Sequence, residues 1–180
     1  MIICAGNNET FDFAQPMGIG LIETAMNLTR ACLFDKPEFL LFVGSAGSYG
    51  DAKIFDIIES KTAANIELGF LNSDAYTPLD NVISTNTEKV KEIIVNSSNY
   101  ISTNDELTKK FLNFGVGIEN MEFFSVLKIA QEFDIPAGGV FCITNYTNKN
   151  AHEDFLKNHE KAKELLTDHV KNRIKELTAR

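Results

Sequence analysis

Three short clusters of polar and small residues carry the side chains most able to do chemistry. Residues 44–47, 119–122 and 144–145 read Gly-Ser-Ala-Gly, Glu-Asn-Met-Glu and Thr-Asn. The small residues of the first cluster would let backbone N–H groups approach an anion or a sugar, and Ser45 adds a hydroxyl. In the second cluster, a carboxylate can accept hydrogen bonds from neighbouring sugar hydroxyls. In the third, the Asn145 amide can both donate and accept, which suits the O6 and N7 edge of a 6-oxopurine.

Each cluster also has an ordinary structural explanation. Small residues after a strand form tight turns, acidic residues at a helix start complement the helix dipole, and asparagine is common in turns. The chemical interpretation therefore depends on whether the fold brings the three clusters together.

The spacing of apolar residues predicts alternating strands and helices. The apolar runs 39–43 and 139–143 are typical of strands buried on both faces of a parallel sheet. Four segments have the apolar spacing of helices: 21–34, 107–114, 121–133 and 151–178. Shorter strands are expected at 1–5, 11–17, 54–58 and 90–95, and mostly loop and edge strand at 61–85.

This alternation predicts a three-layer α/β/α sandwich around a mixed, largely parallel sheet, with residues 1–180 forming one domain. Ligands of such sheets bind at the carboxyl ends of the strands. The first and third clusters directly follow predicted strands, so we expect them to lie at that edge.

Composition and charge exclude several classes of protein. The 180 residues are 44% apolar and 23% charged, which excludes a disordered chain, a collagen and a coiled coil. The net charge of −8 argues against binding to nucleic acid. Arginine occurs only as Arg30, Arg173 and Arg180. An arginine clamp on phosphate would therefore need Arg30, the tail or a neighbouring subunit.

The cysteines and histidines predict neither a disulfide framework nor a metal site. Three cysteines match no zinc or disulfide pattern and are expected to be buried thiols: Cys4, Cys32 and Cys142. Three histidines are too far apart on the predicted helix to meet and are expected to be solvated: His152, His159 and His169. With no signal peptide and no 18-residue apolar run, we expect a cytoplasmic protein that does not contact a membrane.

The order of these segments resembles the nucleoside phosphorylase and nucleosidase superfamily. That superfamily includes purine nucleoside phosphorylases, uridine phosphorylases and methylthioadenosine/S-adenosylhomocysteine nucleosidases. Five segments resemble its S-G-I-G, K-P-D…G-S-A-G, G-D-I-V, E-M-E and base-contacting motifs: 17–20, 36–47, 54–58, 120–122 and 136–145. The resemblance covers nearly the whole chain.

The resemblance implies a purine nucleoside phosphorylase, a glycosyltransferase of purine salvage. Such an enzyme cleaves the N-glycosidic bond of purine (deoxy)nucleosides with phosphate and yields the free base and ribose 1-phosphate. It implies no cofactor, inorganic phosphate as co-substrate, and a homo-oligomer whose sites are completed by neighbouring subunits.

The resemblance also assigns roles to residues of the sugar and phosphate sites. Ser45 and Gly47 belong to the loop that touches phosphate, or the corresponding anion or water site of nucleosidases. Met121 would pack under the ribose, and Glu122 would bind its hydroxyls. His159 lies in a segment similar to one whose histidine contacts the 5′-hydroxyl in trimeric phosphorylases.

Two further residues fall at positions that contact the base. Asn145 stands where many members have an aspartate that protonates N7 of the leaving base. Trimeric purine phosphorylases have asparagine there, within I-T-N, and favour 6-oxopurines. Tyr100 falls near the aromatic residue that stacks on the base.

The sequence departs from the family pattern around the nucleophile. The chain resembles a short, divergent member that lacks the N-terminal strand and its phosphate loop. Phe42 stands where hexameric phosphorylases have an arginine. The general-base glutamate of nucleosidases has no clear counterpart, because Glu9 is expected in a hairpin turn.

Three functions therefore remain open. The main expectation is a phosphorylase whose phosphate site is remodelled or completed by another subunit, favoured by a lysine or arginine near Ser45. The second is a nucleosidase using water, favoured by a carboxylate below the ribose, such as Glu9. The third is a non-catalytic relative that binds nucleosides or serves in assembly, favoured by a pocket that Phe42 fills.

Overall fold

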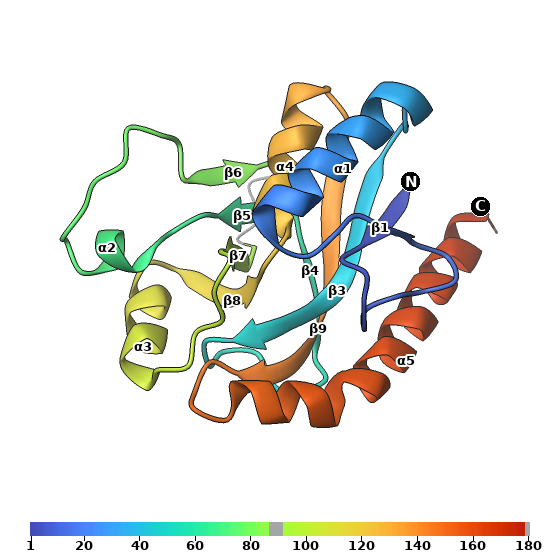
Figure 1. The fold of residues 1–180 in the computed structure, drawn as a ribbon. Coiled ribbons are helices and arrows are strands. Elements are labelled where there is room, and N and C mark those ends of the chain that lie inside the picture. Colours follow the sequence, from blue (N-terminus) through green and yellow to red (C-terminus); the bar gives the residue numbers. More distant parts are fainter. Residues whose placement is uncertain (87–91, 179–180) are drawn as a thin grey trace.

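A computed structural model describes residues 1–86 and 92–178, and one mixed sheet runs through its centre (Figure 1). The nine strands within the described residues are β1 (Ile2–Cys4), β2 (Gln15–Pro16), β3 (Leu40–Ser48), β4 (Ile57–Ser60), β5 (Thr62–Ala64), β6 (Val82–Ser84), β7 (Ile94–Ser97), β8 (Val116–Asn120) and β9 (Ala137–Tyr146). Five neighbouring pairs run parallel, and β3–β8, β4–β9 and β5–β6 run antiparallel. The mixed, mostly parallel sheet is confirmed.

Strands β3 and β9 form the centre of the sheet. They pair in parallel from Leu40 and Ala137 to Ser48 and Tyr146, with a register shift between Ala46 and Gly47. Along its other edge, β3 pairs first with β1 and then with β8. Because side chains alternate between the two faces of a strand, β3 supplies apolar residues to both layers of the core.

Helices cover both faces of this sheet (Figure 1). They are α1 (Gly20–Asp35), α2 (Leu68–Leu71), α3 (Asp105–Asn113), α4 (Phe123–Glu132) and α5 (Ala151–Thr178). Helices α1 and α4 pack on each other, whereas α5 lies against β9 and β3 on the opposite face. No helix in the described part of the chain is both long and apolar enough to cross a membrane.

An aromatic cluster fills the core on the α1 and α4 side. The ring centroids of Phe42 lie 6.3 Å from Phe123 and 5.8 Å from Phe141, and all three side chains are fully buried. Such pairs stabilise a core by about 0.5–1.5 kcal/mol each beyond their burial. Phe42 therefore serves the core and does not fill a pocket.

The structure corrects several predicted elements. Residues 44–47 continue β3 instead of forming a turn, and β8 was not predicted. The strand expected at 54–58 begins at Ile57, and the one expected at 90–95 lies partly outside the described residues. The three cysteines are buried free thiols, as predicted.

Candidate active site

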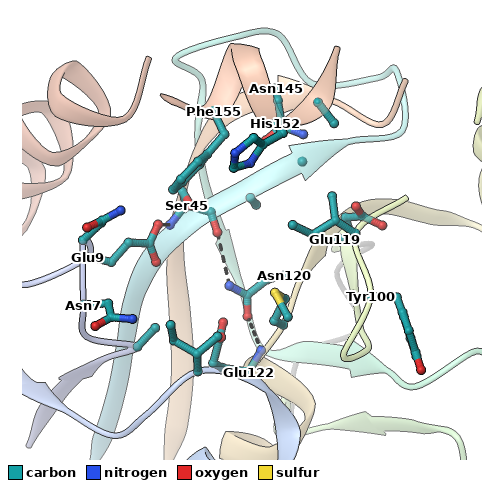
Figure 2. Close-up of a pocket in the computed structure, with 18 of the residues that line it drawn as sticks. Asn7, Glu9, Ser45, Tyr100, Glu119, Asn120, Glu122, Asn145, His152 and Phe155 are labelled. Atoms are coloured by element: carbon teal, nitrogen blue, oxygen red, sulfur yellow. Dashed lines mark hydrogen bonds between the residues drawn. The ribbon is translucent and has the colours of Figure 1, made fainter. Parts of the chain in front are cut away.

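A pocket of about 260 Å³ brings the three sequence clusters together (Figure 2). It lies where β1, β3, β8 and β9 approach the start of α5. Its lining residues come from segments 5–9, 45–47, 100–101, 119–122 and 151–155, together with Ile19 and Asn145. The segments are far apart in sequence, so the pocket exists only in the folded chain.

Glu9 reaches this pocket from the tight turn that follows β1. The turn uses positive φ angles at Gly6 (105°) and Asn7 (54°), which glycine and asparagine tolerate best. The Ser45 backbone N–H donates to Glu9 Oε1 at 3.0 Å, and the Ser45 hydroxyl also interacts with this carboxylate. The segment that was expected to bind an anion therefore donates its Ser45 hydrogen bonds to the carboxylate of Glu9 instead.

The carboxylate of Glu9 needs the absence of a side chain at Gly44. A Cβ atom there would lie 2.8 Å from the Phe42 ring and 3.2 Å from Glu9 Oε2. Burial raises the pKa of Glu9, although the bonds from Ser45 and the charges of His159 and Lys163 oppose that rise.

Glu122 faces the same pocket from the N-terminus of α4. Its Oε1 accepts a hydrogen bond from the Gly20 N–H at 2.9 Å, and only 3% of the residue is exposed. Burial is the main cause that raises the pKa of Glu122 to about 7, and the negative charge of Glu9 adds to it. The charge of Glu9 therefore makes Glu122 harder to ionise.

Asn120 holds Glu122 in register with β3. Its Oδ1 accepts the N–H groups of Glu122 at 2.8 Å and Phe123 at 3.0 Å, which begins helix α4. Its Nδ2 donates to the Ser45 carbonyl at 3.2 Å (Figure 2). One amide thus links β3, whose Ser45 binds Glu9, to the start of α4, which carries Glu122.

Replacing Glu122 by glutamine is expected to stabilise the protein at alkaline pH. The pKa of this carboxyl rises from its ordinary 4.5 to about 7 on folding. Its contribution to stability is therefore full below pH 4.5 and is lost as the pH rises through 7. The difference between these values corresponds to roughly 3 kcal/mol. Urea unfolding at pH 5 and pH 8 would show the variant gaining on the natural protein only at pH 8. An equal difference at both pH values would contradict this assignment.

Asn145 occupies the wall of the pocket beside Gly47. Its Oδ1 accepts from the Thr144 hydroxyl at 2.9 Å, and its Nδ2 donates to the Tyr146 carbonyl at 3.2 Å. A Cβ atom on Gly47 would lie only 3.0 Å from that Nδ2. Glycine at this position therefore lets the amide approach β3 closely.

Four other predicted site residues also line the pocket. Ser45, Gly47 and Met121 lie in its walls, whereas Tyr100 lies at the margin and is 83% exposed. In Figure 2 the Tyr100 ring points away from the centre of the pocket. The predicted stacking of Tyr100 on a base therefore stays a prediction.

The histidine that lines the pocket is not the predicted one. His152 is exposed, as expected, and also lies in the pocket wall near Asn145 (Figure 2). His159 was also expected to be solvated, but it is only 8% exposed; it lies about two turns farther along α5, with Nε2 3.0 Å from Glu160 Oε1. It is absent from the lining residues, so the expected contact of His159 with a 5′-hydroxyl has no direct support in this geometry.

The electrostatics of the pocket are acidic. Glu9, Glu119 and Glu122 line it, whereas none of the described lining residues is lysine or arginine. Arg30 is exposed on α1, and Arg173 pairs with Glu59 and Glu176 on the surface. The described residues contain no group of three or more His, Cys, Asp or Glu placed to hold a metal ion. Among the described lining residues, a phosphate ion would therefore meet carboxylates and no lysine or arginine.

The chain belongs to the phosphorylase superfamily, since the sequence model of that family matches residues 2–175. No curated protein matches it.

Solved structures with the same fold include nucleosidases and a futalosine hydrolase. A mutant methylthioadenosine/S-adenosylhomocysteine nucleosidase of Helicobacter pylori with 5′-methylthioadenosine in its active site has a TM-score of 0.79 at 21% identity, covering 91% of this chain and 79% of that one. The futalosine hydrolase of H. pylori has a TM-score of 0.78 at 20% identity, covering 91% and 78%. A nucleosidase of S. pneumoniae has a TM-score of 0.75 at 12% identity, covering 93% and 94%.

The expectation of a purine nucleoside phosphorylase is wrong. The similar structures are hydrolytic enzymes, which favours the alternative of a nucleosidase that uses water. The pocket agrees, because a carboxylate occupies the Ser45 donors where phosphate was expected. The expected class of transferase is therefore not supported either. A role in nucleoside metabolism is supported.

The sequence named Glu9 only as a candidate carboxylate for the nucleosidase alternative, because its expected place in a hairpin turn gave it no clear counterpart in the family pattern. A signal was nevertheless present. The Gly6-Asn7-Asn8 turn directly follows an apolar strand, and Glu9 is the first acidic residue after it. In an α/β sheet, residues just past a strand's carboxyl end are candidates for the ligand site.

Proposed function

We propose that this protein is a purine nucleosidase, which hydrolyses the N-glycosidic bond with water and releases the free base and ribose. The single observation that carries this proposal is the Glu9 carboxylate, held against Ser45 in a pocket whose described lining contains no lysine or arginine. The hydrolytic activities of structurally similar proteins support it.

Glu9 is the proposed general base. Cleavage of an N-glycosidic bond leaves a cationic, oxocarbenium-like sugar, and water must give up a proton as it attacks. The Ser45 N–H fixes Oε1 of Glu9, and the carboxylate would take the proton of the attacking water. The acidic surroundings also stabilise a positive sugar, since negative groups favour the charge that develops in the transition state.

Glu122, Met121 and Asn145 are proposed to bind the nucleoside. Glu122 would accept hydrogen bonds from ribose hydroxyls, with its other oxygen fixed by the Gly20 N–H. Met121 would pack under the sugar, and Asn145 would bond to the N7 edge of the base. Purine nucleosides, including ones modified at the 5′ position, are the proposed substrates.

The test is base release from inosine, guanosine, adenosine and 5′-methylthioadenosine, each with and without phosphate. We expect release from at least one of them without phosphate, and less than twofold acceleration by it. The products should contain ribose or its 5′-modified form and no sugar 1-phosphate. Release that depends on phosphate would overturn the proposal, as would the absence of any release from folded protein.

Replacing Asn145 by aspartate is expected to accelerate hydrolysis of adenosine at least tenfold, because general acids contribute roughly a hundredfold or more. An amide can donate a hydrogen bond to N7 but cannot transfer a proton, whereas a protonated aspartate can. The Thr144 hydroxyl, which donates to Oδ1, can keep the new side chain in place. Steady-state rates near pH 6 would measure the change. A slower N145D enzyme with unchanged unfolding temperature would contradict the assignment of Asn145 to the base.

The proposed enzyme is also expected to form a homo-oligomer. Large apolar side chains are exposed along helix α1: Ile22, Met26, Leu33 and Phe34. Ile19, at the start of the same helix, lines the pocket. A second copy packed on α1 would therefore lie next to the proposed site.

A further inference from the structure

Glu119 is an acidic group in the pocket wall that the proposed mechanism does not use. It lies on β8 opposite Gly47 of β3, and it lines the pocket from the side where Tyr100 and Ile101 lie. Burial raises its pKa, while hydrogen bonds from Ser102 and Tyr49 oppose that rise. A buried carboxylate needs such partners, since an unpaired one is strongly destabilising.

Three hydrogen bonds converge on this carboxylate. The Ser102 N–H donates to Oε1 at 2.9 Å, and the Ser102 hydroxyl donates to Oε2 at 2.6 Å. The Tyr49 hydroxyl donates to Oε2 at 2.8 Å. Tyr49 is itself immobilised, because it is fully buried and its ring stacks on Phe111 at 4.4 Å. Glu119 therefore ties a loop residue, Ser102, to the rigid sheet.

Ser102 belongs to the loop 98–104 between β7 and α3, and a second residue of this loop, Asn99, is also held by a hydrogen bond. Asn99 Oδ1 accepts the Leu21 N–H at 2.9 Å, at the first turn of α1. Between Asn99 and Ser102 lie only Tyr100 and Ile101, which are exposed and also line the pocket. The Ser98 hydroxyl also bonds to the Tyr100 backbone, donating to its carbonyl at 2.8 Å and accepting its N–H at 3.2 Å, so Tyr100 and Ile101 are positioned by this contact together with those of Asn99 and Ser102.

We propose that Glu119 is a positioning residue for the base-side wall of the pocket, acting through Ser102 on Tyr100 and Ile101. The proposal rests on the proposed function, because it takes this wall to contact the base of a nucleoside. Glu119 itself need not touch the substrate, since its oxygens are already occupied by Ser102 and Tyr49.

The experiment combines kinetics with hydrogen exchange on Glu119→Ala and Ser102→Ala. Loss of hydrogen bonds to a charged group is expected to raise KM for nucleosides about tenfold or more, with kcat within about threefold. Exchange of amides in the loop 98–104 should accelerate about tenfold or more, because its local opening becomes easier. Glu119→Gln, which keeps an acceptor for the Ser102 N–H, should recover part of both effects.

Glu92→Ala is the matched control. Glu92 Oε2 likewise accepts a backbone N–H, from Lys61 at 3.0 Å, and a hydroxyl, from Thr62 at 3.2 Å, but it is absent from the pocket lining. This variant should accelerate hydrogen exchange of the amides near residues 61–62 and leave KM for nucleosides unchanged.

Several outcomes would overturn the positioning role. Loop exchange unchanged in both E119A and S102A would show that the carboxylate does not hold the loop. Faster exchange with unchanged KM would show that the loop is not part of the site. A change of more than about tenfold in the preference between inosine and adenosine, without faster exchange, would instead mean that Glu119 contacts the base directly.

A failure of the proposed function would look different. The natural protein would then release no base from any nucleoside, while hydrogen exchange would still report on the loop. In that case, calorimetric binding of hypoxanthine and adenine replaces the kinetics: a loss of affinity in E119A supports the role, and equal affinity overturns it. If E119A does not fold, S102A and E119Q supply the same comparison.

Discussion

The Glu9→Gln variant is expected to bind nucleosides normally and to hydrolyse them about a thousandfold more slowly, within the range of a general base. Glutamine retains an oxygen that can accept the Ser45 N–H, so the turn after β1 should keep its shape. What it loses is the ability to take a proton from water. Single-turnover base release and an independent binding measurement would separate the two effects.

The pH profile offers a second view of Glu9. Because burial raises the pKa of Glu9, activity should fall on acidification at a higher pH than an exposed carboxylate would give. Glu59→Gln, a surface carboxylate that contacts His169, is a suitable control and should leave the rate unchanged. Retention of more than a tenth of the natural kcat in E9Q would remove Glu9 from the role of base.

The Glu122→Ala variant is expected to lose nucleoside affinity by about a hundredfold or more, since hydrogen bonds to charged groups are worth roughly 1.5–3 kcal/mol each. A carboxylate that binds two vicinal hydroxyls forms two such bonds. The alanine variant also leaves the buried Gly20 N–H without its acceptor, so α1 should lose some stability. A calorimetric titration with a nucleoside would measure this loss of affinity.

Comparison with the free base isolates the ribose contribution. Affinity for hypoxanthine or adenine, which lack the sugar, should change little in the same variant, because Asn145 remains in place. Unchanged affinity for nucleosides, or an equal loss for nucleoside and base, would remove the ribose role from Glu122.

Much of the fold could be predicted because its strongest signals are local. The apolar run 39–43 and the helical spacing of 151–178 both correspond to real elements. Strand β8 was missed because it is short and mixes glycine with polar residues, and its pairing partners lie far away in sequence. Glycine at position 117 lets the Ile93 side chain pack against the strand, because a Cβ atom there would lie 2.8 Å from that side chain.

The sugar and base sides of the site were more predictable than the side of the nucleophile. Ser45 and Asn145 come just after the apolar runs 39–43 and 139–143, and Glu122 stands at the start of a predicted helix, so their common location could be inferred. Glu9 depends on the conformation of a turn and on its contact with Ser45, which no local pattern reveals. The choice between phosphate and water depended on that one contact.

The pairing of β3 with β9 has a consequence for how the chain acquires its structure. About half of the chain separates the end of β3 at Ser48 from the start of β9 at Ala137, yet the two strands form the longest ladder among the described strands. During synthesis, the apolar β3 emerges long before β9, and only the short strand β1 precedes it as a partner. Long-range parallel pairing is slow, and exposed apolar strands are prone to aggregate. Nascent chains that end before β9 should therefore be the most dependent on chaperones.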